Sequence, residues 1–363
     1  MRAALLDNTP TYDIPPSPVS DPAGWLGPDI QNSDRWQYRL SSSDLADIDA
    51  ALKSVRNKGL SIIEIGKDDF PLGAFGETLQ RLRHDLLEGL GLFKLSGVPV
   101  GGRYSMEDSA ILYWGIGAHL GFPVSQNGRG HLLGHVIDLG RSSESEGLKK
   151  YRGYSSREEL AYHQDSADLV GLFCLAQAKS GGESVLVSSV AIHNEIHRTR
   201  PDLLKVLYQP FWVSRKSEIP AGAKPYFRIP IFNYFQGRLT AYFSGGHMMA
   251  LKVFPELPPF TEEQQEGIAL INKLANDPRF HMRMTLQPGD IQFLHNHVVL
   301  HSRTGFEDFE DPAKKRHLLR LWLATTDGRP LPHWFYEKYR GGRRAGVYVP
   351  GVKEVVTLDP YAD

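Results

Sequence analysis

The spacing of apolar residues changes near Gly121, and this change limits the folds that the chain can adopt. Before that point, apolar side chains recur every three or four residues, which predicts helices that begin near Ser41 and that span 75–90 and 105–120. After it, short apolar runs are separated by Gly, Pro, Asn and Asp, a pattern typical of a β-rich core. The sequence therefore predicts one β-sandwich or barrel domain, covered by helices from the N-terminal third.

Individual elements follow from the same patterns. We expect strands at 61–65, 91–99, 291–293 and 318–324, and helical inserts at 188–198 and 261–275. Gln236-Gly237 separates two apolar runs, at 226–231 and 238–243, and predicts a hairpin between them. Residues 1–35 are rich in Pro, Asp, Ser and Asn and lack periodicity. We therefore expect an irregular N-terminal arm over 1–35 and a single domain over 36–363.

The composition narrows the class of protein and its partners. Lysine and arginine total 41 residues and aspartate and glutamate total 42, so charge gives no reason to expect nucleic acid or an anionic membrane as partner. No apolar run reaches the roughly 18 residues that span a membrane, and the N-terminus lacks a basic stretch followed by an apolar one. Cys174 is the only cysteine, which excludes an intrachain disulfide. We expect a cytoplasmic enzyme for a small-molecule substrate, and a homo-oligomer is compatible with these features.

Two segments far apart in the chain carry side chains that can ligate a metal. His163 and Asp165 are two residues apart, so a strand would project both from one face. By itself this pair is weak evidence, because a surface turn or a hydrogen-bonded histidine explains it as well. The second segment follows a turn at 288–290 and offers His295, His297 and His301. One of these three would complete two imidazoles and one carboxylate, the ligand set typical of mononuclear iron(II) oxygenases.

An arginine lies inside an apolar strand pattern downstream of these histidines. Arg320 stands within 318–323, where a guanidinium is costly unless its charge is paired. A carboxylate is its best partner, because the planar guanidinium can make two parallel hydrogen bonds to it. A structural salt bridge to Asp or Glu is one interpretation, and a bound carboxylate ligand is the other.

Three stretches resemble the iron(II)/2-oxoglutarate dioxygenases of the taurine dioxygenase (TauD/TfdA) family. They are 162–168, which contains the His-x-Asp pair, then 178–184, which ends in Gly-Gly-Glu-Ser, and 289–303 with the two arginines after it. The likeness extends from about Gly91 to about Asp327. It implies an α+β fold whose double-stranded β-helix (jelly-roll, cupin-like) core covers about 91–327, with flanking helices, helical inserts and a C-terminal tail.

The resemblance also implies which residues hold the iron. The family's distal histidine stands five residues after an asparagine, here Asn296, and this spacing selects His301. The implied metal ligands and catalytic centre are therefore His163, Asp165 and His301, with Fe(2+) as the metal. 2-Oxoglutarate is implied as the cosubstrate and O2 as the oxidant.

Three further residues would bind the 2-oxoglutarate. Arg320 matches the family's arginine for the distal carboxylate, Arg316 matches a second basic position nearby, and Ser184 matches a hydroxyl that assists the same carboxylate. Extra residues at 310–313 separate His301 from both arginines. Either arginine could therefore be the main anchor for the distal carboxylate of 2-oxoglutarate, and we expect Arg320 first.

The substrate is only weakly indicated. Gln126 and Asn127 lie in a Gly-rich loop that often lines the substrate pocket in the family, although a polar turn explains them equally. Arg228 lies among aromatic residues that could hold an organic acid or simply pack in the core. We expect a small molecule such as a carboxylate, an amino acid or a specialised metabolite. The basic cluster at 340–344 is interpreted as a solvated loop first, with closure over an anionic substrate as the alternative.

Two other classes of protein compete with the oxygenase. A zinc-dependent hydrolase could use the same His/Asp/His set, but it would need neither a buried arginine nor the Gly-Gly-Glu-Ser segment. A non-catalytic binding protein on the same scaffold would have no reason to retain all three ligand types. Halogenation is disfavoured because family halogenases replace the carboxylate ligand, whereas Asp165 is present. We therefore expect oxidation of an unactivated C–H bond, by hydroxylation first, with desaturation and cyclisation as alternatives.

Overall fold

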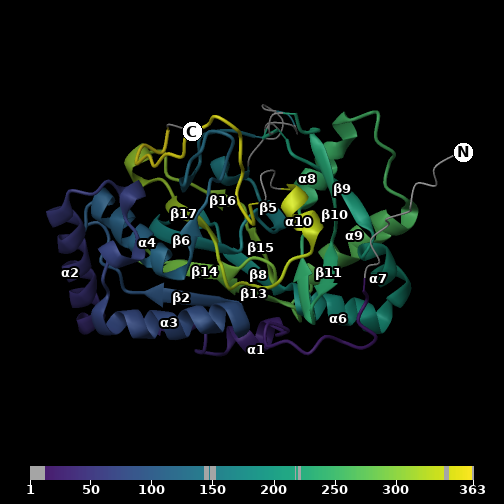
Figure 1. Cartoon of the computed structure of the whole chain (residues 1–363), viewed down its shortest axis with the longest axis horizontal. Helices are drawn as coiled ribbons and strands as arrows, with labels where there is room; N and C mark the ends of the chain where they lie inside the picture. The colour runs from purple at the N-terminus through teal and green to yellow at the C-terminus, as the bar shows by residue number, and fades with distance from the viewer. Residues whose placement is uncertain are drawn as a thin grey trace, which may run out of the picture.

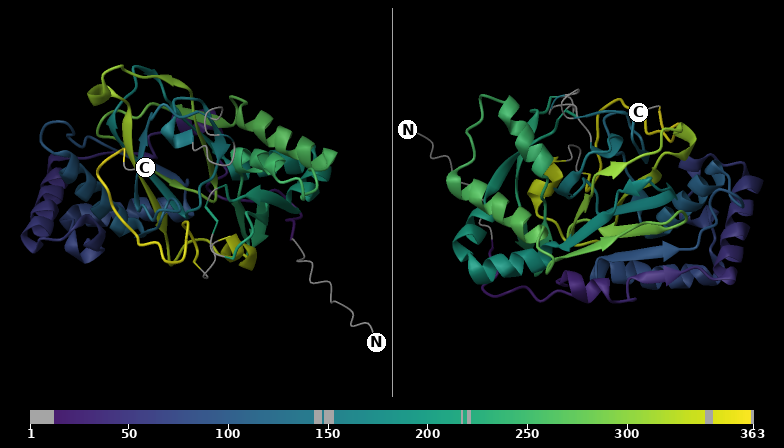
Figure 2. Two further views of the ribbon diagram at one scale, coloured as in Figure 1. Left: turned by 90° about the horizontal axis from the view of Figure 1, so that it is seen from above. Right: turned by 180° about the vertical axis from the view of Figure 1, so that it is seen from behind.

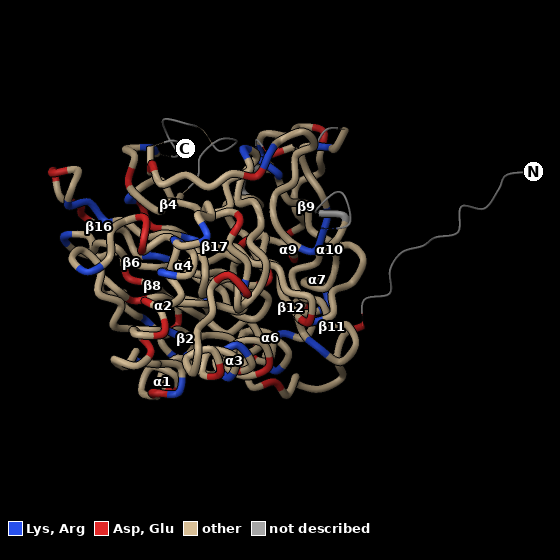
Figure 3. The backbone as a smooth tube through the Cα atoms, turned by 60° about the vertical axis from the view of Figure 1, so that its left-hand side comes forward, with Lys and Arg blue, Asp and Glu red and all other residues tan. Residues whose placement is uncertain are grey.

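The computed structural model describes residues 13–142, 147, 153–216, 218–219, 222–338 and 343–361. Residues 1–12 of the predicted arm lie outside this range. Within it, two β-sheets occupy the middle of the molecule and helices lie to either side of them (Figures 1 and 2). No helix among the described residues is long and apolar enough to cross a membrane. Basic and acidic residues are interspersed along the chain (Figure 3).

The larger sheet has the strand order β1-β2-β14-β6-β17-β3, and β4 also pairs with β17. Its strands are Gln37–Arg39 (β1), Leu92–Ser96 (β2), Phe122–Pro123 (β3), Leu133–Ile137 (β4), Leu169–Ala176 (β6), Ile291–His295 (β14) and His317–Ala324 (β17). Neighbouring strands run antiparallel except β1 and β2, which run parallel. The strands predicted at 91–99, 291–293 and 318–324 are therefore confirmed, with shifted ends.

The smaller sheet has the antiparallel order β13-β8-β15-β5. Its strands are Leu160–His163 (β5), Ser184–Ser188 (β8), His281–Met284 (β13) and Val299–Arg303 (β15). Three two-stranded ladders accompany the sheets, namely Pro210–Ser214 (β9) with Tyr226–Pro230 (β10), Phe232–Phe235 (β11) with Arg238–Ala241 (β12), and Ser180–Gly181 (β7) with Phe306–Glu307 (β16).

Side-chain alternation along β17 explains how the larger sheet packs. Leu319, Leu321 and Leu323 belong to the core shared with the N-terminal helices. Because successive strand residues point to opposite faces, Arg320 and Trp322 project from the other face of the sheet. The arginine in the apolar pattern thus points away from the helices and toward the cavities described below.

Three helices lie on the outer side of the larger sheet (Figure 1), of which the second and third contact its strands and the first packs on those two helices. They are Ser42–Lys58 (α2), Gly73–Glu88 (α3) and Met106–Leu120 (α4), close to the three predicted ranges. Ser41 and Ser105 cap α2 and α4 by accepting a hydrogen bond from the backbone N–H three residues on, which satisfies a donor that the helix leaves unpaired. The start predicted near Ser41 is therefore confirmed for α2.

The remaining helices lie beside the smaller sheet and in the connections. The two predicted inserts are confirmed as Ser189–Thr199 (α6) and Glu262–Ala275 (α9). The others are Gly27–Gln31 (α1), Pro201–Leu207 (α7), Gly245–Met249 (α8) and His333–Lys338 (α10), with 3-10 turns at Ile62–Glu64 (η1), Lys67–Asp69 (η2), Gly153–Ser155 (η3), Ala250–Val253 (η4) and Pro312–Lys314 (η5). Helix α1 lies within the arm that was expected to be irregular.

Two local predictions were wrong. The strand expected at 61–65 is the 3-10 turn η1, because the Glu64 carboxylate accepts hydrogen bonds from the backbone N–H and hydroxyl of Ser61 and so closes a helical turn. The hairpin at Gln236-Gly237 exists, but β12 pairs with β11, whereas 226–230 forms β10 and pairs with β9. Both turn residues have positive φ, at 49° and 77°, which fixes the short hairpin in this register.

Candidate metal centre and adjoining cavities

His163, Asp165 and His301 lie together beside the smaller sheet. His163 ends β5 and pairs in register with His301 of β15, and the centroids of their rings are 4.2 Å apart. The carboxylate of Asp165 faces both rings, with Oδ1 lying 3.6 Å from Nε2 of His163 and Oδ2 lying 3.7 Å from Nε2 of His301. One donor atom from each residue lies within 4.8 Å of the other two. Two imidazoles and one carboxylate at this spacing suit a single iron(II) ion.

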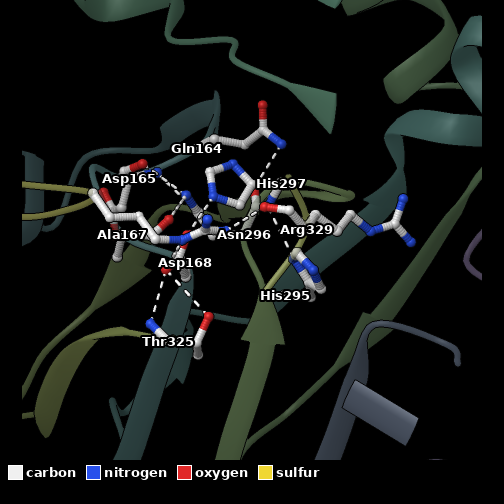
Figure 4. A network of polar contacts seen from close by, with 10 residues as sticks. Gln164, Asp165, Ala167, Asp168, His295, Asn296, His297, Thr325 and Arg329 are labelled. Atoms are coloured by element: carbon white, nitrogen blue, oxygen red, sulfur yellow. Dashed lines mark hydrogen bonds and ion pairs between the residues drawn. The ribbon is translucent and has the colours of Figure 1, made fainter. Parts of the chain in front are cut away.

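Asp165 reaches this cluster from a loop. The sequence predicted that one strand would carry His163 and Asp165, but β5 ends at His163, so that part was wrong. Asn296 holds the loop instead (Figure 4). Its Oδ1 accepts a hydrogen bond from the N–H of Asp165 (2.9 Å), and its Nδ2 donates to the backbone oxygens of Asp165 (2.7 Å) and Ala167 (2.8 Å). One side chain therefore satisfies three backbone groups and fixes where the carboxylate points.

Replacing Asn296 with alanine is expected to weaken iron(II) binding by about 10- to 100-fold, because residues that orient metal ligands typically contribute this much. Competition with a fluorescent chelator would measure the dissociation constant. Asn276→Ala is a matched control, because Asn276 is exposed and follows α9. Equal iron affinity in both variants would show that Asn296 does not position the ligand loop.

The environment of His163 keeps its imidazole neutral. Nδ1 lies 2.9 Å from the backbone oxygen of Ala161, so the proton belongs on Nδ1 and the lone pair of Nε2 faces Asp165 and His301. Burial, with a further contribution from His301, lowers the pKa of His163 to about 4. The ring can therefore act as a metal ligand at neutral pH without first losing a proton.

The carboxylate of Asp165 is held in its charged form. Burial alone would raise its pKa, but hydrogen bonding to His301 and the positive charge of Arg320 lower the pKa well below its usual range. The indole Nε1 of Trp322 donates a hydrogen bond of 2.8 Å to Oδ2, and Nη1 of Arg320 lies 3.9 Å from the same oxygen. Trp322 was missed by sequence reasoning, although its position two residues after Arg320 on a strand could have indicated it.

The two other candidate histidines make separate contacts (Figure 4). Nε2 of His297 lies 2.8 Å from Oδ1 of Asp168. His295 is 1% exposed, and its Nδ1 accepts a hydrogen bond from the N–H of His297. The structure thus brings His301 to the ligand pair and keeps these two away from it.

A small cavity beside the cluster, here named the inner cavity, is lined by both sheets. It measures about 50 Å³, and Leu172, Gln292 and Arg320 reach it from the larger sheet while Ser184 reaches it from the smaller one. Arg316, which directly precedes β17, also lines it. The three residues expected to hold 2-oxoglutarate therefore share one cavity with the proposed metal ligands.

Arg316 carries a buried charge that forms no ion pair with a carboxylate among the described residues, although the charge of Asp308 acts on it from farther away. It is 5% exposed, and among the described residues its guanidinium forms no ion pair and its Nη1 has no hydrogen-bond partner. Its nearest polar contact is a 3.5 Å hydrogen bond from Nη2 to the backbone oxygen of Gly182, and the ring of Phe306 lies beneath it. Burial, together with the charge of Arg303, lowers the pKa of Arg316 to about 10. Such a charge is costly unless an anion joins it.

Arg320 is differently placed, because it already has polar partners. Its Nε donates a 2.7 Å hydrogen bond to Oε1 of Gln126. The centroids of the Tyr154 and Trp322 rings lie 4.7 and 4.9 Å from its guanidinium carbon, and both rings stabilise the cation. It lines the inner cavity and also a second cavity of about 270 Å³, here named the outer cavity, which contains His163 and Asp165.

The three predicted substrate residues have different positions. Gln126 lines the outer cavity and is tied to Arg320. Asn127 instead lines a separate cavity of about 210 Å³ under the C-terminal segment, here named the tail cavity. Arg228 is exposed on β10 over the ring of Trp212 and lines none of these three cavities, so the structure does not bring it to the site.

Comparison with known proteins agrees with this geometry. Residues 54–322 match the family described as taurine catabolism dioxygenase TauD, TfdA family. The chain is 32% identical over 329 residues to FR-33289 synthase of Streptomyces rubellomurinus, covering 88% of this chain and 94% of that protein. It is 29% identical over 312 residues to the taurine hydroxylase-like protein SAT17 of Stachybotrys chartarum, covering 84% and 79%.

Solved structures show a related fold. An asparagine oxygenase in complex with Fe(II), hydroxyasparagine and succinate has a TM-score of 0.61 at 15% identity, covering 86% of this chain and 100% of that one. The non-heme iron oxygenase OrfP, solved with iron, succinate and hydroxy-L-Arg, has a TM-score of 0.60 at 13% identity, covering 85% and 99%.

The family match and the relatives identify a non-heme iron oxygenase, and the clustered side chains of His163, Asp165 and His301 agree with that class. The chain belongs to the TauD/TfdA family. It is an iron(II)- and 2-oxoglutarate-dependent dioxygenase that oxidises a C–H bond of a small organic molecule. Neither a zinc-dependent hydrolase nor a non-catalytic binding protein is favoured by these relationships.

Proposed function

We propose that His163, Asp165 and His301 bind the iron(II) with which this chain oxidises its substrate. Their clustered donor atoms, the neutral imidazole of His163 and the charged carboxylate of Asp165 support this assignment. Asn296 and Trp322 would hold Asp165 in place through the loop backbone and the carboxylate. Hydroxylation is the outcome that we propose first, with desaturation and cyclisation as alternatives.

We further propose that Arg316, and not Arg320, is the main anchor for the distal carboxylate of 2-oxoglutarate. The observation that carries this proposal is the buried guanidinium of Arg316, which has no carboxylate partner among the described residues. Ser184 lines the same cavity and would add a hydroxyl donor. Arg320 would instead hold Asp165 and the metal-facing end of the site, because Gln126 and Asp165 already engage it. This order reverses the expectation from sequence.

Gly182 offers a test of this anchor. A Cβ at this position would lie 2.9 Å from Nε of Arg316, and its φ of +72° is a conformation that glycine adopts more readily than other residues. Gly182→Ala is therefore expected to raise the KM for 2-oxoglutarate by about tenfold or more, because small displacements of positioning groups are costly. The rate of succinate release at varied 2-oxoglutarate would measure this.

Gly101→Ala provides the matched control for that substitution. Gly101 has a similar φ of +74°, but no atom lies within 4 Å of its added Cβ. The control separates the backbone penalty from the displacement of Arg316. An unchanged KM in Gly182→Ala would argue against Arg316 as the anchor.

The reaction that we propose divides its tasks between the ligands and the protein. Bound iron would activate dioxygen, and 2-oxoglutarate would supply two electrons and leave as succinate and carbon dioxide. Arg316 and Ser184 would fix the far end of 2-oxoglutarate so that its other end meets the metal. The partly enclosed cavities would limit water near the reacting C–H bond.

We propose a small, polar substrate on the scale of an amino acid. The outer cavity measures about 270 Å³ and is lined by side chains of both charge signs, including Lys216, Glu159 and Arg320. The relatives carry names that refer to different compounds, among them FR-33289, taurine and uridine-5'-phosphate, so membership of the family does not identify the substrate. The solved neighbours hold hydroxyasparagine and hydroxy-L-Arg, which supports the amino-acid scale.

A panel of amino acids, other carboxylates and specialised metabolites would test this substrate class. Each compound is added without oxygen to the protein loaded with iron(II) and 2-oxoglutarate, and a shift of the metal-to-ligand absorption band reports binding near the metal. We expect charged compounds of amino-acid size to shift the band. A shift only with large apolar compounds would contradict the proposal.

The wider assignments are proposals as well. We propose that the two sheets form a double-stranded β-helix, or jelly-roll, within a single domain over 36–363 that follows the arm at 1–35. The antiparallel pairing of the smaller sheet and the cavity lined by both sheets support this architecture. A cytoplasmic location and a homo-oligomer remain predictions from the sequence.

The direct test of the proposed activity needs no knowledge of the substrate. Uncoupled turnover converts 2-oxoglutarate slowly to succinate in the absence of substrate. Iron(II)-dependent release of succinate should therefore be measurable with only the protein, iron(II), 2-oxoglutarate and dioxygen. We expect release with iron(II) and none with zinc(II). Hydrolytic activity with zinc(II), together with no succinate with iron(II), would favour the zinc alternative.

A further inference from the structure

The segment Arg344–Val347 lies outside the part of the chain that matches the family, because the match ends at residue 322. Arg344 was interpreted from sequence as part of a solvated loop, but its side chain is only 17% exposed and pairs with Asp168 at 2.6 Å between Nε and Oδ2. Its Nη2 also donates a 2.6 Å hydrogen bond to the backbone oxygen of Arg329. Residues 340–342 of the same cluster lie outside the described residues.

Asp168 is a strong anchor for this segment (Figure 4). It is 1% exposed and accepts a 2.9 Å hydrogen bond from the N–H of Thr325, while Nε2 of His297 lies 2.8 Å from its other oxygen. Burial would raise the pKa of Asp168, but His297 and Arg344 together lower it to about 2. The carboxylate of Asp168 is therefore charged in its contact with Arg344. Asp168 stands three residues after the proposed ligand Asp165 in the chain.

Backbone hydrogen bonds hold the rest of the segment against the loop that carries Asp165 and against the loop that carries Gln126. The N–H of Gly346 donates to the backbone oxygen of Ser166 at 2.7 Å, in the ligand loop itself. The N–H of Val347 donates to the backbone oxygen of Ser125 at 2.8 Å, next to Gln126. A Cβ on Gly346 would lie 2.9 Å from Cβ of Val124, so the segment packs closely onto the loop that carries Gln126.

Val347 lies where two cavities meet. It lines the outer cavity, which contains His163 and Asp165, and it also lines the tail cavity with Asn127. Its side chain contacts the small apolar cluster of Ala167, Val170 and Trp322. The Val347 side chain therefore belongs to the partition between the metal-facing space and a polar space under the C-terminal segment.

We propose that the segment Arg344–Val347 is the wall of the substrate cavity that determines which substrates fit. Val347 is the residue that limits substrate size, and Arg344 is a positioning residue that holds the wall to the ligand loop through Asp168. This inference rests on the proposed function, because it takes the outer cavity as the substrate site. Substrates longer than the outer cavity can extend into the tail cavity and reach Asn127 only when a smaller side chain replaces Val347.

A thiol placed in the partition tests the wall without a known substrate. Cys174 is the only cysteine and is 1% exposed, so Val347→Cys adds a single accessible thiol. The variant is treated with methyl or benzyl methanethiosulfonate, then loaded without oxygen with iron(II), 2-oxoglutarate and nitric oxide as a dioxygen analogue. The electron paramagnetic resonance spectrum of the nitrosyl complex responds to whatever occupies the open side of the metal.

We expect the benzyl group on residue 347 to change the nitrosyl spectrum in most molecules and the methyl group to leave it nearly unchanged. Val349→Cys is the matched control, because Val349 lines the tail cavity but not the outer one. Its benzyl derivative should give the spectrum of the unlabelled protein. Identical spectra for the benzyl derivatives at 347 and 349 would contradict the proposal that this segment forms a wall of the substrate cavity.

The positioning role of Arg344 is tested on the labelled protein. Arg344→Ala in the benzyl-labelled Val347→Cys variant is expected to abolish the spectral change, whereas Arg344→Lys should keep part of it. A change that persists fully in Arg344→Ala would show that this residue does not position the wall. The unlabelled protein separates a failure of the proposed function from a failure of the proposed wall. If it formed no nitrosyl complex, the proposed function would be contradicted, and the proposed wall, which rests on it, would be contradicted as well.

Discussion

Replacing His163 with alanine is expected to abolish the iron(II)-dependent release of succinate from 2-oxoglutarate. The substitution removes one of three clustered donor groups and leaves Asp165 and His301 as the remaining pair. Substitution of a residue that only orients a metal ligand weakens metal binding by about 10- to 100-fold. Loss of a ligand itself should therefore weaken iron(II) binding by more than about 100-fold. Succinate release at fixed iron(II), together with chelator competition, would measure both effects.

The exposed histidine on α10 provides a control for this loss. His333→Ala removes an imidazole that lines none of the three cavities described above, so its activity and iron affinity should equal those of the unmodified chain. If His163→Ala released succinate at the unmodified rate and the same iron concentration, the ligand assignment would be wrong.

Replacing Arg316 with alanine is expected to raise the dissociation constant for 2-oxoglutarate by about 100-fold. Truncating one partner of a buried charge pair typically costs about 2–5 kcal/mol, and about 2.7 kcal/mol corresponds to 100-fold. The buried guanidinium of Arg316 has no carboxylate partner among the described residues, so the distal carboxylate would supply the missing charge. Titration of the metal-to-ligand band with 2-oxoglutarate would report the constant while iron binding is measured separately.

Two further substitutions decide between the arginines. Arg316→Lys should bind 2-oxoglutarate with intermediate affinity, because an ammonium keeps the charge but loses the two-pronged contact. Arg320→Ala should weaken 2-oxoglutarate less than Arg316→Ala does, and Arg283→Ala, at an exposed position, should have no effect. A larger loss in Arg320→Ala would reverse the proposed order of the anchors.

The elements with a clear period could be predicted from sequence, and those set by local hydrogen bonds could not. Apolar residues that recur every three or four positions identified α3 and α4, because this spacing places them on one face of a helix. The run at 61–65 is too short to show a period, and the contacts between Ser61 and Glu64 decide its conformation. The first strand of the hairpin was misplaced because the apolar run at 226–231 continues almost to the strand that actually pairs.

The site divides in the same way. The residue types indicated His163, Asp165 and one of three histidines, because ligand chemistry depends on side chains that are visible in sequence. The family resemblance then selected His301 through its spacing from Asn296. The order of the arginines depends on burial next to Gly182 and Phe306, which only the fold creates.

The C-terminal wall shows the same limit of local patterns. Arg344 pairs with a residue 176 positions away in the chain, so the apparent solvated loop could not reveal this contact. Only the packing of the tail onto the ligand loop makes it visible.

Anaerobic addition of 2-oxoglutarate to the iron(II)-loaded chain tests the central claim most directly. Chelation of the metal by 2-oxoglutarate gives a visible metal-to-ligand absorption band that neither component gives alone. We predict this band in the unmodified chain, its loss in His163→Ala, and its appearance only at much higher 2-oxoglutarate in Arg316→Ala. An iron-loaded, unmodified chain that shows no band at saturating 2-oxoglutarate would contradict the account.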